Sequence, residues 1–316
     1  MWDKKHLLGL EELSAGDILD ILDKAQNYRA TALDEDKPCD ALAGRRVVLM
    51  FFESSTRTRV SFEIAVERLG GSVTALSADT SSVKKGESLL DTVRTIDSMG
   101  VDFMVVRHPA SGAACQIAQA VSASVVNAGD GTHEHPTQGL LDMLTIRQRK
   151  GAIAGLRVGI VGDILHSRVA RSNLFGLTKL GASVVLIGPP TLVPDSFKSL
   201  GAEISNSLDD AIHQCDVLNV LRIQRERLDG QFFPSVREYC ELYRLDRVRM
   251  RRAKPDVLVM HPGPMNRGIE ITPDVADGAN SVILEQVSNG VAVRMAVLDI
   301  LNSPRRSRRD APVGRL

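Results

Sequence analysis

The feature that most constrains this chain is a short stretch, rich in hydroxyl groups and arginines, between an apolar run and a helical pattern. The apolar run from Val47 to Phe52 is typical of a buried strand. The helical pattern is a set of apolar residues at the spacing of one helix face: Phe62, Ala65, Val66 and Leu69. The stretch Ser54-Ser55-Thr56-Arg57-Thr58-Arg59 lies between the two.

This stretch suits the binding of a phosphate group. The first turn of a helix carries unpaired backbone N–H donors and the positive end of the helix dipole. Hydroxyl and guanidinium groups placed there add donors that converge on one point. An ordinary serine cap followed by solvated arginines is the alternative. The strand before, the helix after and the density of donors favour a phosphate site, and Arg59 is expected to be structural.

Length and composition limit the remaining possibilities. The chain has 316 residues and no formal net charge, and this length predicts two domains. The charge balance does not indicate nucleic acid or a membrane as a partner. No membrane-spanning run or signal peptide is evident. Four isolated cysteines are typical of reduced thiols in a cytoplasmic protein: Cys39, Cys115, Cys215 and Cys240.

Strand and helix patterns alternate along the chain, which predicts an α/β fold with parallel sheets covered by helices. The expected strands are 47–52, 72–76, 102–106, 124–127, 156–161, 183–187, 216–220 and 257–260. The expected helices include one capped by Ser14, and those at 87–99, 112–120, 136–149, 167–180, 208–213 and 286–301. Residues 221–254 are rich in arginine and weakly periodic, so we expect a long mobile segment there.

The pattern restarts after Lys150-Gly151-Ala152, which we take as the domain boundary. The expected domains are residues 1–149 and 150–285. We expect the helix at 286–301 to pack back on the first domain, and residues 302–316 to form a basic tail.

Polar residues follow several of the expected strands. Ligands of open parallel sheets bind at the carboxyl ends of strands. In the first half these ends offer Arg57, Lys85, Arg107 and His135. Converging cations cost stability unless an anion binds among them, so the group predicts an anion site. In the second half they offer Arg168, Arg222, Gln224 and the segment His261-Pro262-Gly263-Pro264-Met265-Asn266-Arg267-Gly268.

Cofactor motifs are not evident. Gly159-Ile160-Val161-Gly162-Asp163 lacks the G-x-G-x-x-G spacing of dinucleotide sites, and the chain has no G-x-x-x-x-G-K-[ST] loop. His133 and His135 flank Glu134 and suggest a metal, but additional ligands are not apparent. We therefore expect neither a cofactor nor a metal.

Four motifs carry a resemblance to a known family. Phe51-Phe52-Glu53-Ser54-Ser55-Thr56-Arg57-Thr58 resembles the carbamoyl-phosphate motif of the aspartate and ornithine carbamoyltransferases, and His135-Pro136-Thr137-Gln138 resembles a second motif. Lys84-Lys85-Gly86-Glu87-Ser88 and the segment 261–268 are similar to the aspartate branch. The ornithine branch typically has a His-Cys-Leu-Pro segment, which is absent here. The resemblance covers residues 5–301. It implies two domains, each a parallel sheet flanked by helices, joined by interdomain helices.

The resemblance also implies an activity and its residues. Carbamoyl transfer from carbamoyl phosphate to L-aspartate, the committed step of de novo pyrimidine biosynthesis, would depend on Arg57, Thr58, Lys85, Arg107 and His135. The residues for carbamoyl phosphate would be Ser55, Thr56, Arg57, Thr58, Arg107, His135, Gln138, Pro262, Gly263 and Pro264. Those for aspartate would be Ser81, Lys85, Arg168, Arg222 and Gln224. Some relatives have leucine where Gly263 stands, which can change the flexibility of that turn.

In this family Ser81 and Lys85 would come from the neighbouring subunit of a homotrimer with shared active sites. The trimer could stand alone or join regulatory chains or a dihydroorotase. Two alternatives stay open: a carbamoyltransferase for ornithine or an acylated ornithine, and an inactive subunit that supports a partner enzyme. The cationic groups disfavour both, because ornithine brings an ammonium group and a scaffold does not need a cluster of cations.

Overall fold

The computed structural model describes residues 2–33, 39–77, 87–223 and 235–309. The predicted site residues Ser81, Lys85 and Gln224 lie outside these ranges. The chain divides into two compact units: unit 1 is Met1–Thr137 with Ser288–Leu316, and unit 2 is Gln138–Val287. Both unit boundaries fall inside helices, α5 (Pro136–Lys150) and α11 (Ile283–Arg309), so the chain passes between the units in helical segments.

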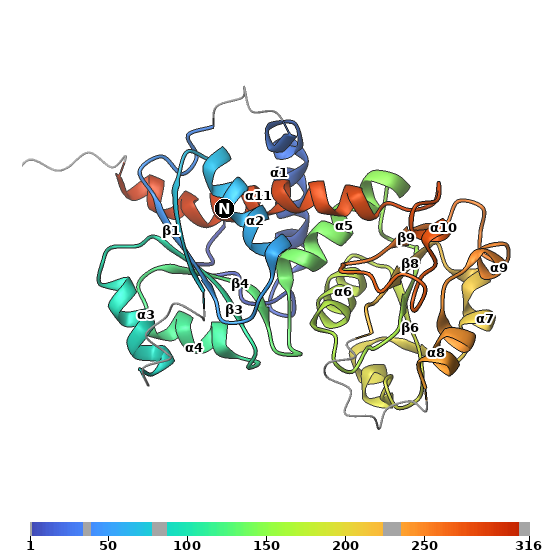
Figure 1. Cartoon of the computed structure of the whole chain (residues 1–316). Helices are drawn as coiled ribbons and strands as arrows, with labels where there is room; N and C mark the ends of the chain where they lie inside the picture. The colour runs from blue at the N-terminus through green and yellow to red at the C-terminus, as the bar shows by residue number, and fades with distance from the viewer. Residues whose placement is uncertain (1, 34–38, 78–86, 224–234, 310–316) are drawn as a thin grey trace, which may run out of the picture. The chain divides into compact units, whose positions relative to one another are not determined.

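Unit 1 contains a parallel four-stranded sheet in the order β2-β1-β3-β4 (Figure 1). Its strands are β1 (Arg46–Phe51), β2 (Ser72–Ser77), β3 (Phe103–His108) and β4 (Ser124–Asp130). Its helices are α1 (Ala15–Leu33), α2 (Thr56–Arg68), α3 (Leu89–Asp97) and α4 (Ala113–Ala120), together with the later part of α11. Every residue of β4 is buried, as expected for a strand covered on both faces.

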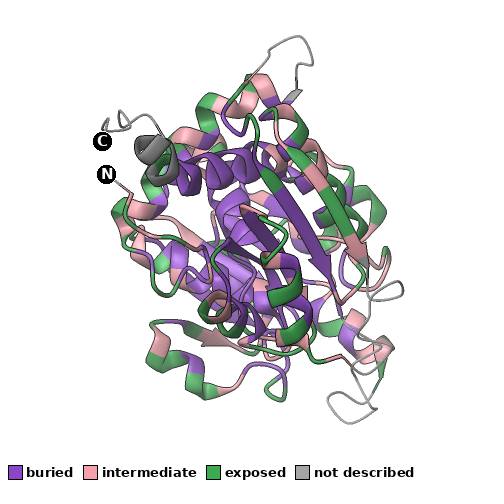
Figure 2. Cartoon of the chain, turned by 90° about the vertical axis from the view of Figure 1, so that its left-hand side faces the viewer, coloured by how far each residue is buried: buried purple, intermediate pink, exposed green. Residues whose placement is uncertain are grey.

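Successive residues of each strand point to opposite faces of this sheet. One face packs on α3 and α4 through an apolar cluster that includes Val48, Met50, Val93, Met104 and Ile117. The other face carries Val47, Leu49 and Val105, which are also buried, and α1, α2 and α11 lie on that side (Figure 1). Buried residues form most of β1, β3 and β4 and the inner helix surfaces, whereas residues 72–76 of the edge strand β2 are intermediate or exposed (Figure 2).

Unit 2 contains a parallel five-stranded sheet in the order β7-β6-β5-β8-β9. Its strands are β5 (Arg157–Val161), β6 (Ser183–Ile187), β7 (Glu203–Ser205), β8 (Val217–Val220) and β9 (Leu258–Met260). Its helices are most of α5, the start of α11, and α6 (Arg168–Lys179), η3 (Asp195–Leu200), α7 (Leu208–Ala211), η4 (Ile212–Gln214), α8 (Val236–Tyr243), α9 (Arg247–Met250) and α10 (Pro273–Ala276). One face of the sheet packs on α7, α8 and α10 in a single apolar cluster.

The predicted α/β fold is confirmed: each unit is a parallel sheet flanked by helices, and helical segments connect the units. The expected strands agree with the observed ones to within a few residues. Ser14 caps α1, because its Oγ accepts a hydrogen bond from Asp17 N at 3.1 Å. Where the functional domains divide, at residue 149 or elsewhere, stays a prediction.

Two parts of the prediction need revision. Residues 235–254, where the sequence shows only weak periodicity, contain α8 and α9, and the expected mobility of the segment stays a prediction. Tyr239 and Tyr243 bury one face of α8, and the Asp246 side chain caps α9 by accepting from Val248 N and Arg249 N. Helices of eight and four residues are too short for a helical period to be visible in the sequence.

The final helix was also underestimated. It begins at Ile283 and continues to Arg309, so residues 302–309 are helical rather than part of a tail. Asn302 is buried, and its Nδ2 donates to the Ala41 carbonyl at 2.8 Å within unit 1. Within the described ranges no helix combines the length and the apolar character needed to cross a membrane.

Candidate active site

The turn between β1 and α2 contains the predicted phosphate-binding residues. Helix α2 starts at Thr56, and Ser55 is its N-cap with extended backbone, φ −160° and ψ 91°. The Ser55 side chain makes no capping hydrogen bond, so its hydroxyl is not committed to the helix. Thr58 is buried, whereas Thr56 and Arg57 are exposed at the helix start. Hydroxyl groups, a guanidinium and the helix N-terminus therefore lie together, as the phosphate prediction requires.

Arg107 lies beside this turn. It is the β3 partner of Phe51 at the end of β1, and its carbonyl accepts from Phe52 N at 2.9 Å. Its guanidinium donates through Nη2 to Glu53 Oε1 at 3.1 Å and through Nη1 to the Ala128 carbonyl at 3.2 Å. These contacts hold one cation between the ends of β1, β3 and β4.

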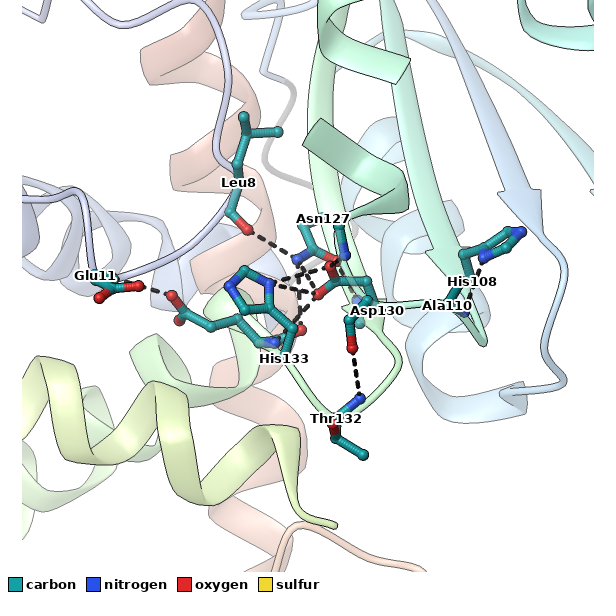
Figure 3. Close-up of polar contacts among 12 residues, drawn as sticks. Leu8, Glu11, His108, Ala110, Asn127, Asp130, Thr132 and His133 are labelled. Carbon is teal, nitrogen blue, oxygen red and sulfur yellow. Dashed lines mark hydrogen bonds and ion pairs between the residues drawn. The ribbon is translucent and has the colours of Figure 1, made fainter. Parts of the chain in front are cut away.

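The loop after β4 is fixed by side chains of its own motif (Figure 3). Asn127 Nδ2 donates to Asp130 Oδ1 and to the Leu8 carbonyl, both at 2.8 Å. Asp130 also accepts from Gly112 N at 2.7 Å and Glu134 N at 3.2 Å. The Glu134 carboxylate, fully buried, accepts from Leu10 N and Glu11 N. The residue that follows, His135, is therefore held at a fixed position, with 4 % of its surface exposed.

Asp130 and His133 influence each other's protonation. Burial alone would raise the pKa of Asp130, but hydrogen bonds from His133, Asn127 and Gly112 outweigh it and lower the pKa below its ordinary value. The hydrogen bond to Asp130 raises the pKa of His133, against the opposing effect of burial. The pair is separated by 3.1 Å between His133 Nδ1 and Asp130 Oδ2.

One group of side chains in the described ranges has the spacing of metal ligands: Glu11, His133 and Glu134. Two of its three members already make hydrogen bonds within the protein. Glu134 accepts from two backbone N–H groups, and His133 Nδ1 contacts Asp130. This geometry explains the fold of the loop without a metal, and the expectation that the protein uses none stays a prediction.

Unit 2 brings together its own predicted residues at the carboxyl ends of β5, β8 and β9. Arg168 is the first residue of α6 and is buried, and Ser167 caps that helix by accepting from Ala170 N at 3.1 Å. Arg222 follows β8, and Leu221 N donates to the Val161 carbonyl of β5 at 2.8 Å. The Asn266 side chain donates to the Ile223 carbonyl at 3.2 Å, which joins the segment after β9 to the segment after β8.

The turn after β9 depends on two buried side chains from elsewhere in unit 2. Gln286 Oε1 accepts from His261 N at 2.9 Å. Glu270 Oε1 accepts from Asn266 N and lies 3.3 Å from His261 Nε2, and neither ring nor carboxylate is exposed. His261 Nδ1 accepts from Gly263 N at 2.8 Å, so the ring proton lies on Nε2 facing Glu270. Gly263 has φ +63°, a left-handed conformation that favours glycine.

A buried carboxylate that the sequence analysis missed lies behind this site. Asp142 in α5 accepts four hydrogen bonds from neutral amides. Its Oδ1 accepts from Gln138 Nε2 at 2.9 Å and Gln286 Nε2 at 2.8 Å. Its Oδ2 accepts from Asn173 Nδ2 at 2.7 Å and Asn219 Nδ2 at 3.2 Å. Burial raises the pKa of Asp142 to about 6, although the four hydrogen bonds act in the opposite direction.

A signal for Asp142 was present in the sequence. It is the single charged residue of the run Gly139-Leu140-Leu141-Asp142-Met143-Leu144, and it lies four residues after Gln138 on the same helix. Residues four apart on a helix are neighbours on its surface. That spacing could have linked Asp142 to the predicted ligand Gln138.

The structure thus groups the predicted residues in two sets. Unit 1 brings together the turn Ser55–Thr58, Arg107 and the loop that ends at His135. Unit 2 brings together Arg222 and the 261–268 segment, with Arg168 at the start of α6. These features are typical of the class of two-domain α/β proteins whose strand ends carry cationic and hydroxyl groups suited to small anions.

Comparisons with known proteins identify the family. Residues 5–148 match the model described as aspartate/ornithine carbamoyltransferase, carbamoyl-P binding domain, and residues 154–301 match the Asp/Orn binding domain of the same family. A Brucella ovis protein named aspartate carbamoyltransferase catalytic subunit is 53% identical over 307 residues, which cover 97% of this chain and 95% of that protein. The chain belongs to the aspartate/ornithine carbamoyltransferase family.

Solved structures agree with this assignment. The Trypanosoma cruzi aspartate transcarbamoylase in complex with carbamoyl phosphate is similar with a TM-score of 0.86 and 33% identity, over 95% of this chain and 96% of that one. The Pyrococcus furiosus ornithine carbamoyltransferase is similar with a TM-score of 0.83 and 31% identity, over 93% and 96%. Structural likeness therefore extends to both branches of the family.

Proposed function

We propose that this chain transfers the carbamoyl group of carbamoyl phosphate to the amine of L-aspartate, giving N-carbamoyl-L-aspartate and phosphate. The observation that carries the proposal is the position of Arg107, whose guanidinium is held by Glu53 and Ala128 beside the start of α2. The Brucella ovis relative named as an aspartate carbamoyltransferase catalytic subunit supports the same reaction. The reaction would serve as the committed step of pyrimidine biosynthesis.

Unit 1 supplies groups for carbamoyl phosphate. Ser55, Thr56, Arg57 and Thr58 bind the phosphate in this proposal, using hydroxyl, guanidinium and helix N-terminal donors. The carbonyl oxygen of the substrate gains negative charge when the amine attacks. Thr58, Arg107 and His135 stabilise that charge, and the loss of one such donor typically lowers turnover by about 10²–10³-fold.

Unit 2 supplies groups for the second substrate. Arg168 and Arg222 bind the carboxylates of aspartate, and Gln224, outside the described residues, assists them. The neutral amine then attacks the carbamoyl carbon, a C–N bond forms and the C–O bond to phosphate breaks. The leaving phosphate accepts the amine proton. Orienting both reactants can supply roughly 7–11 kcal/mol of the barrier reduction, so a separate general base is not required.

The carbamoyl NH₂ group needs hydrogen-bond acceptors. Gln138 and the carbonyls of Pro262 and Gly263 provide them in this proposal, with Pro264 completing the turn. Gln138 Nε2 is already directed to Asp142, which leaves its Oε1 to accept. The turn itself is fixed through His261 by Gln286 and Glu270.

The assembly and its location are part of the proposal. Lys85 and Ser81 reach the site of a neighbouring subunit in a homotrimer, which stands alone or joins regulatory chains or a dihydroorotase in the cytoplasm. Both residues lie outside the described ranges, so this step rests on the motif alone. Light scattering of the purified protein, with and without those partners, measures the assembly.

A direct assay tests the reaction. The purified protein is incubated with carbamoyl phosphate and either L-aspartate or L-ornithine, and carbamoyl-aspartate, citrulline and phosphate are measured. We expect carbamoyl-aspartate and phosphate in equal amounts. Citrulline without carbamoyl-aspartate would instead assign the chain to the ornithine reaction, and intact trimers with no turnover would indicate a supporting subunit.

A further inference from the structure

We propose that Asp142 is a positioning residue that fixes the orientation of the Gln138 amide, so that its oxygen faces the carbamoyl NH₂ group and the protein discriminates carbamoyl phosphate from analogues without N–H groups. This inference rests on the proposed function. It goes beyond it, because the carboxylate of Asp142 accepts from four protein amides and the proposed reaction gives Asp142 no role.

The hydrogen bonds around Asp142 leave little freedom. An ionised carboxylate has two oxygens and about four acceptor sites, and here all four are occupied by amide N–H groups. An acceptor of this kind can contact an amide only through its NH₂ side. Gln138 must therefore present Nε2 to Asp142 and Oε1 to its other neighbours. A carbamoyl NH₂ group, which donates and does not accept, fits that oxygen.

The same carboxylate oxygen also acts on the turn after β9. Asp142 Oδ1 fixes the Gln286 amide through Nε2 at 2.8 Å, which leaves Gln286 Oε1 to accept from His261 N at 2.9 Å. His261 in turn accepts from Gly263 N. One atom thus orients Gln138 and, through Gln286, the turn that carries the Pro262 and Gly263 carbonyls. All of these residues belong to unit 2.

The four groups that donate hydrogen bonds to Asp142 carry no charge. They come from α5, α6, β8 and α11, and all four are neutral amides. Burial raises the pKa of Asp142 to about 6. Protonation below that pH turns one acceptor oxygen into a donor, and an adjacent amide must then rotate. Two further titratable groups lie along this hydrogen-bond chain, His261 and Glu270, which face each other.

The test compares two ligands in the full-length wild-type and D142N proteins. Carbamoyl phosphate has the NH₂ group, whereas acetyl phosphate has a methyl group in its place. Affinity is measured by calorimetry, which does not depend on turnover, and kcat/KM is measured with aspartate. We expect D142N to weaken the binding of carbamoyl phosphate about 10-fold or more, and the binding of acetyl phosphate by less than about 3-fold. Asp216→Asn is the control. Asp216 accepts from Arg157 N and Lys254 Nζ at the amino ends of the strands, whereas the candidate site lies at their carboxyl ends.

The outcomes separate the two proposals. Equal weakening of both ligands, or a D142N protein that discriminates like wild type, would overturn the positioning role. A wild-type protein that binds carbamoyl phosphate but does not carbamoylate aspartate would overturn the proposed function and leave the binding comparison valid.

Should D142N not fold, the ratio of the two affinities in wild type is followed as the pH falls through about 6. A ratio that stays constant there contradicts the proposal. Gln286→Ala removes the hydrogen-bond link between His261 and Asp142. The affinity ratio of this variant should still change as the pH falls through about 6, because Asp142 still contacts Gln138.

Discussion

The loop after β4 in unit 1 and the turn after β9 in unit 2 both carry predicted ligands, but they are held in different ways. The unit 1 loop is fixed by side chains of its own motif, Asn127, Asp130 and Glu134, which bind backbone groups. The unit 2 turn depends on Gln286, 25 residues away, and on Asp142, 144 residues from Gln286. The side chains that fix the first therefore lie within its own motif, although Leu8, Leu10 and Glu11, whose backbone groups they bind, are distant in sequence. The side chains that fix the second lie outside its motif.

The largest expected effect tests whether unit 1 motif residues act on the ligand rather than on the fold. Arg57→Ala should lower turnover about 10²–10³-fold, since it removes a charged donor at the helix start. Thermal unfolding should change little, because Arg57 is exposed. Steady-state kinetics and a thermal melt measure both quantities.

Arg59→Ala is the matched control, two residues away on the same helix. Arg59 Nε lies 3.6 Å from Glu63 Oε1, an exposed pair of small energetic value. Its loss should change turnover by less than about 2-fold, well under 1 kcal/mol. Similar losses of turnover for the two variants would mean that Arg57 has no specific role in binding the substrate. The phosphate-binding function assigned to this motif would then be wrong.

The second largest effect concerns the buried acceptor of the unit 2 turn. Glu270→Ala removes the partner of His261 Nε2 and Asn266 N; the side chains of His261 and Glu270 are fully buried, and Asn266 is half-buried. Leaving buried donors unpaired costs about 1–3 kcal/mol each, so the free energy of unfolding should fall by a few kcal/mol. Urea unfolding measures the loss.

Glu270→Gln sharpens this test, because a Gln oxygen can still accept from both donors. Oε2 of Glu270 is buried and makes no hydrogen bond in the structure, so an NH₂ group there breaks no existing contact. Gln should therefore retain most of the stability that Ala loses. Equal destabilisation by the two variants would show that shape, and not hydrogen bonding, stabilises the turn.

The sequence predicted what depends on local pattern. Val47 to Phe52 and the apolar spacing of Phe62 to Leu69 placed β1 and α2, because buried strands and helix faces have fixed periods. Arg107 was located because it follows a strand, and strand register then brings it beside Phe51. Thus the unit 1 side of the candidate site was available from the sequence.

The remaining features depend on distant residues. Asp142 shares its hydrogen bonds with Asn173, Asn219 and Gln286, which are brought together only by the folding of unit 2. Single-sequence periodicity contains no information on such pairs. The same holds for α9, whose buried Arg249 donates to Asp209, 40 residues away. Long-range polar networks are therefore the part of unit 2 that patterns could not predict.

A smaller effect is expected at the unit 2 turn itself. Gly263 has φ +63°, where a Cβ group costs about 1–2 kcal/mol. Gly263→Ala should lower the free energy of unfolding by that amount and weaken the binding of carbamoyl phosphate. Gly16→Ala in the first turn of α1 is the control and should not destabilise the protein, because its Cβ would meet only Ser14 Oγ at 3.7 Å. Urea unfolding and calorimetry provide the comparison. An unchanged G263A protein would show that the turn accommodates a side chain by shifting its backbone.

The smallest effect belongs to the unit 1 loop and depends on pH. The hydrogen bond to Asp130 raises the pKa of His133 from its ordinary value of 6.5, so its contribution to stability is complete below 6.5 and is lost as the pH rises through the raised value. The pKa of Asp130 is lowered from 3.8, so its contribution is present above 3.8 and is lost at lower pH. His133→Ala should therefore lower the free energy of unfolding most between pH 3.8 and 6.5, where both groups are charged.

The side chain of His133 is 43% exposed, and solvent screening should keep the effect below about 1 kcal/mol. Urea unfolding of wild type and His133→Ala across this pH range measures the difference, with His213→Ala as a control, since His213 has no ion pair among the described residues. A difference that does not diminish above the raised pKa would mean that His133 stabilises the loop as a neutral ring. The loop would then resemble the turn after β9, where neutral donors and buried acceptors determine the geometry.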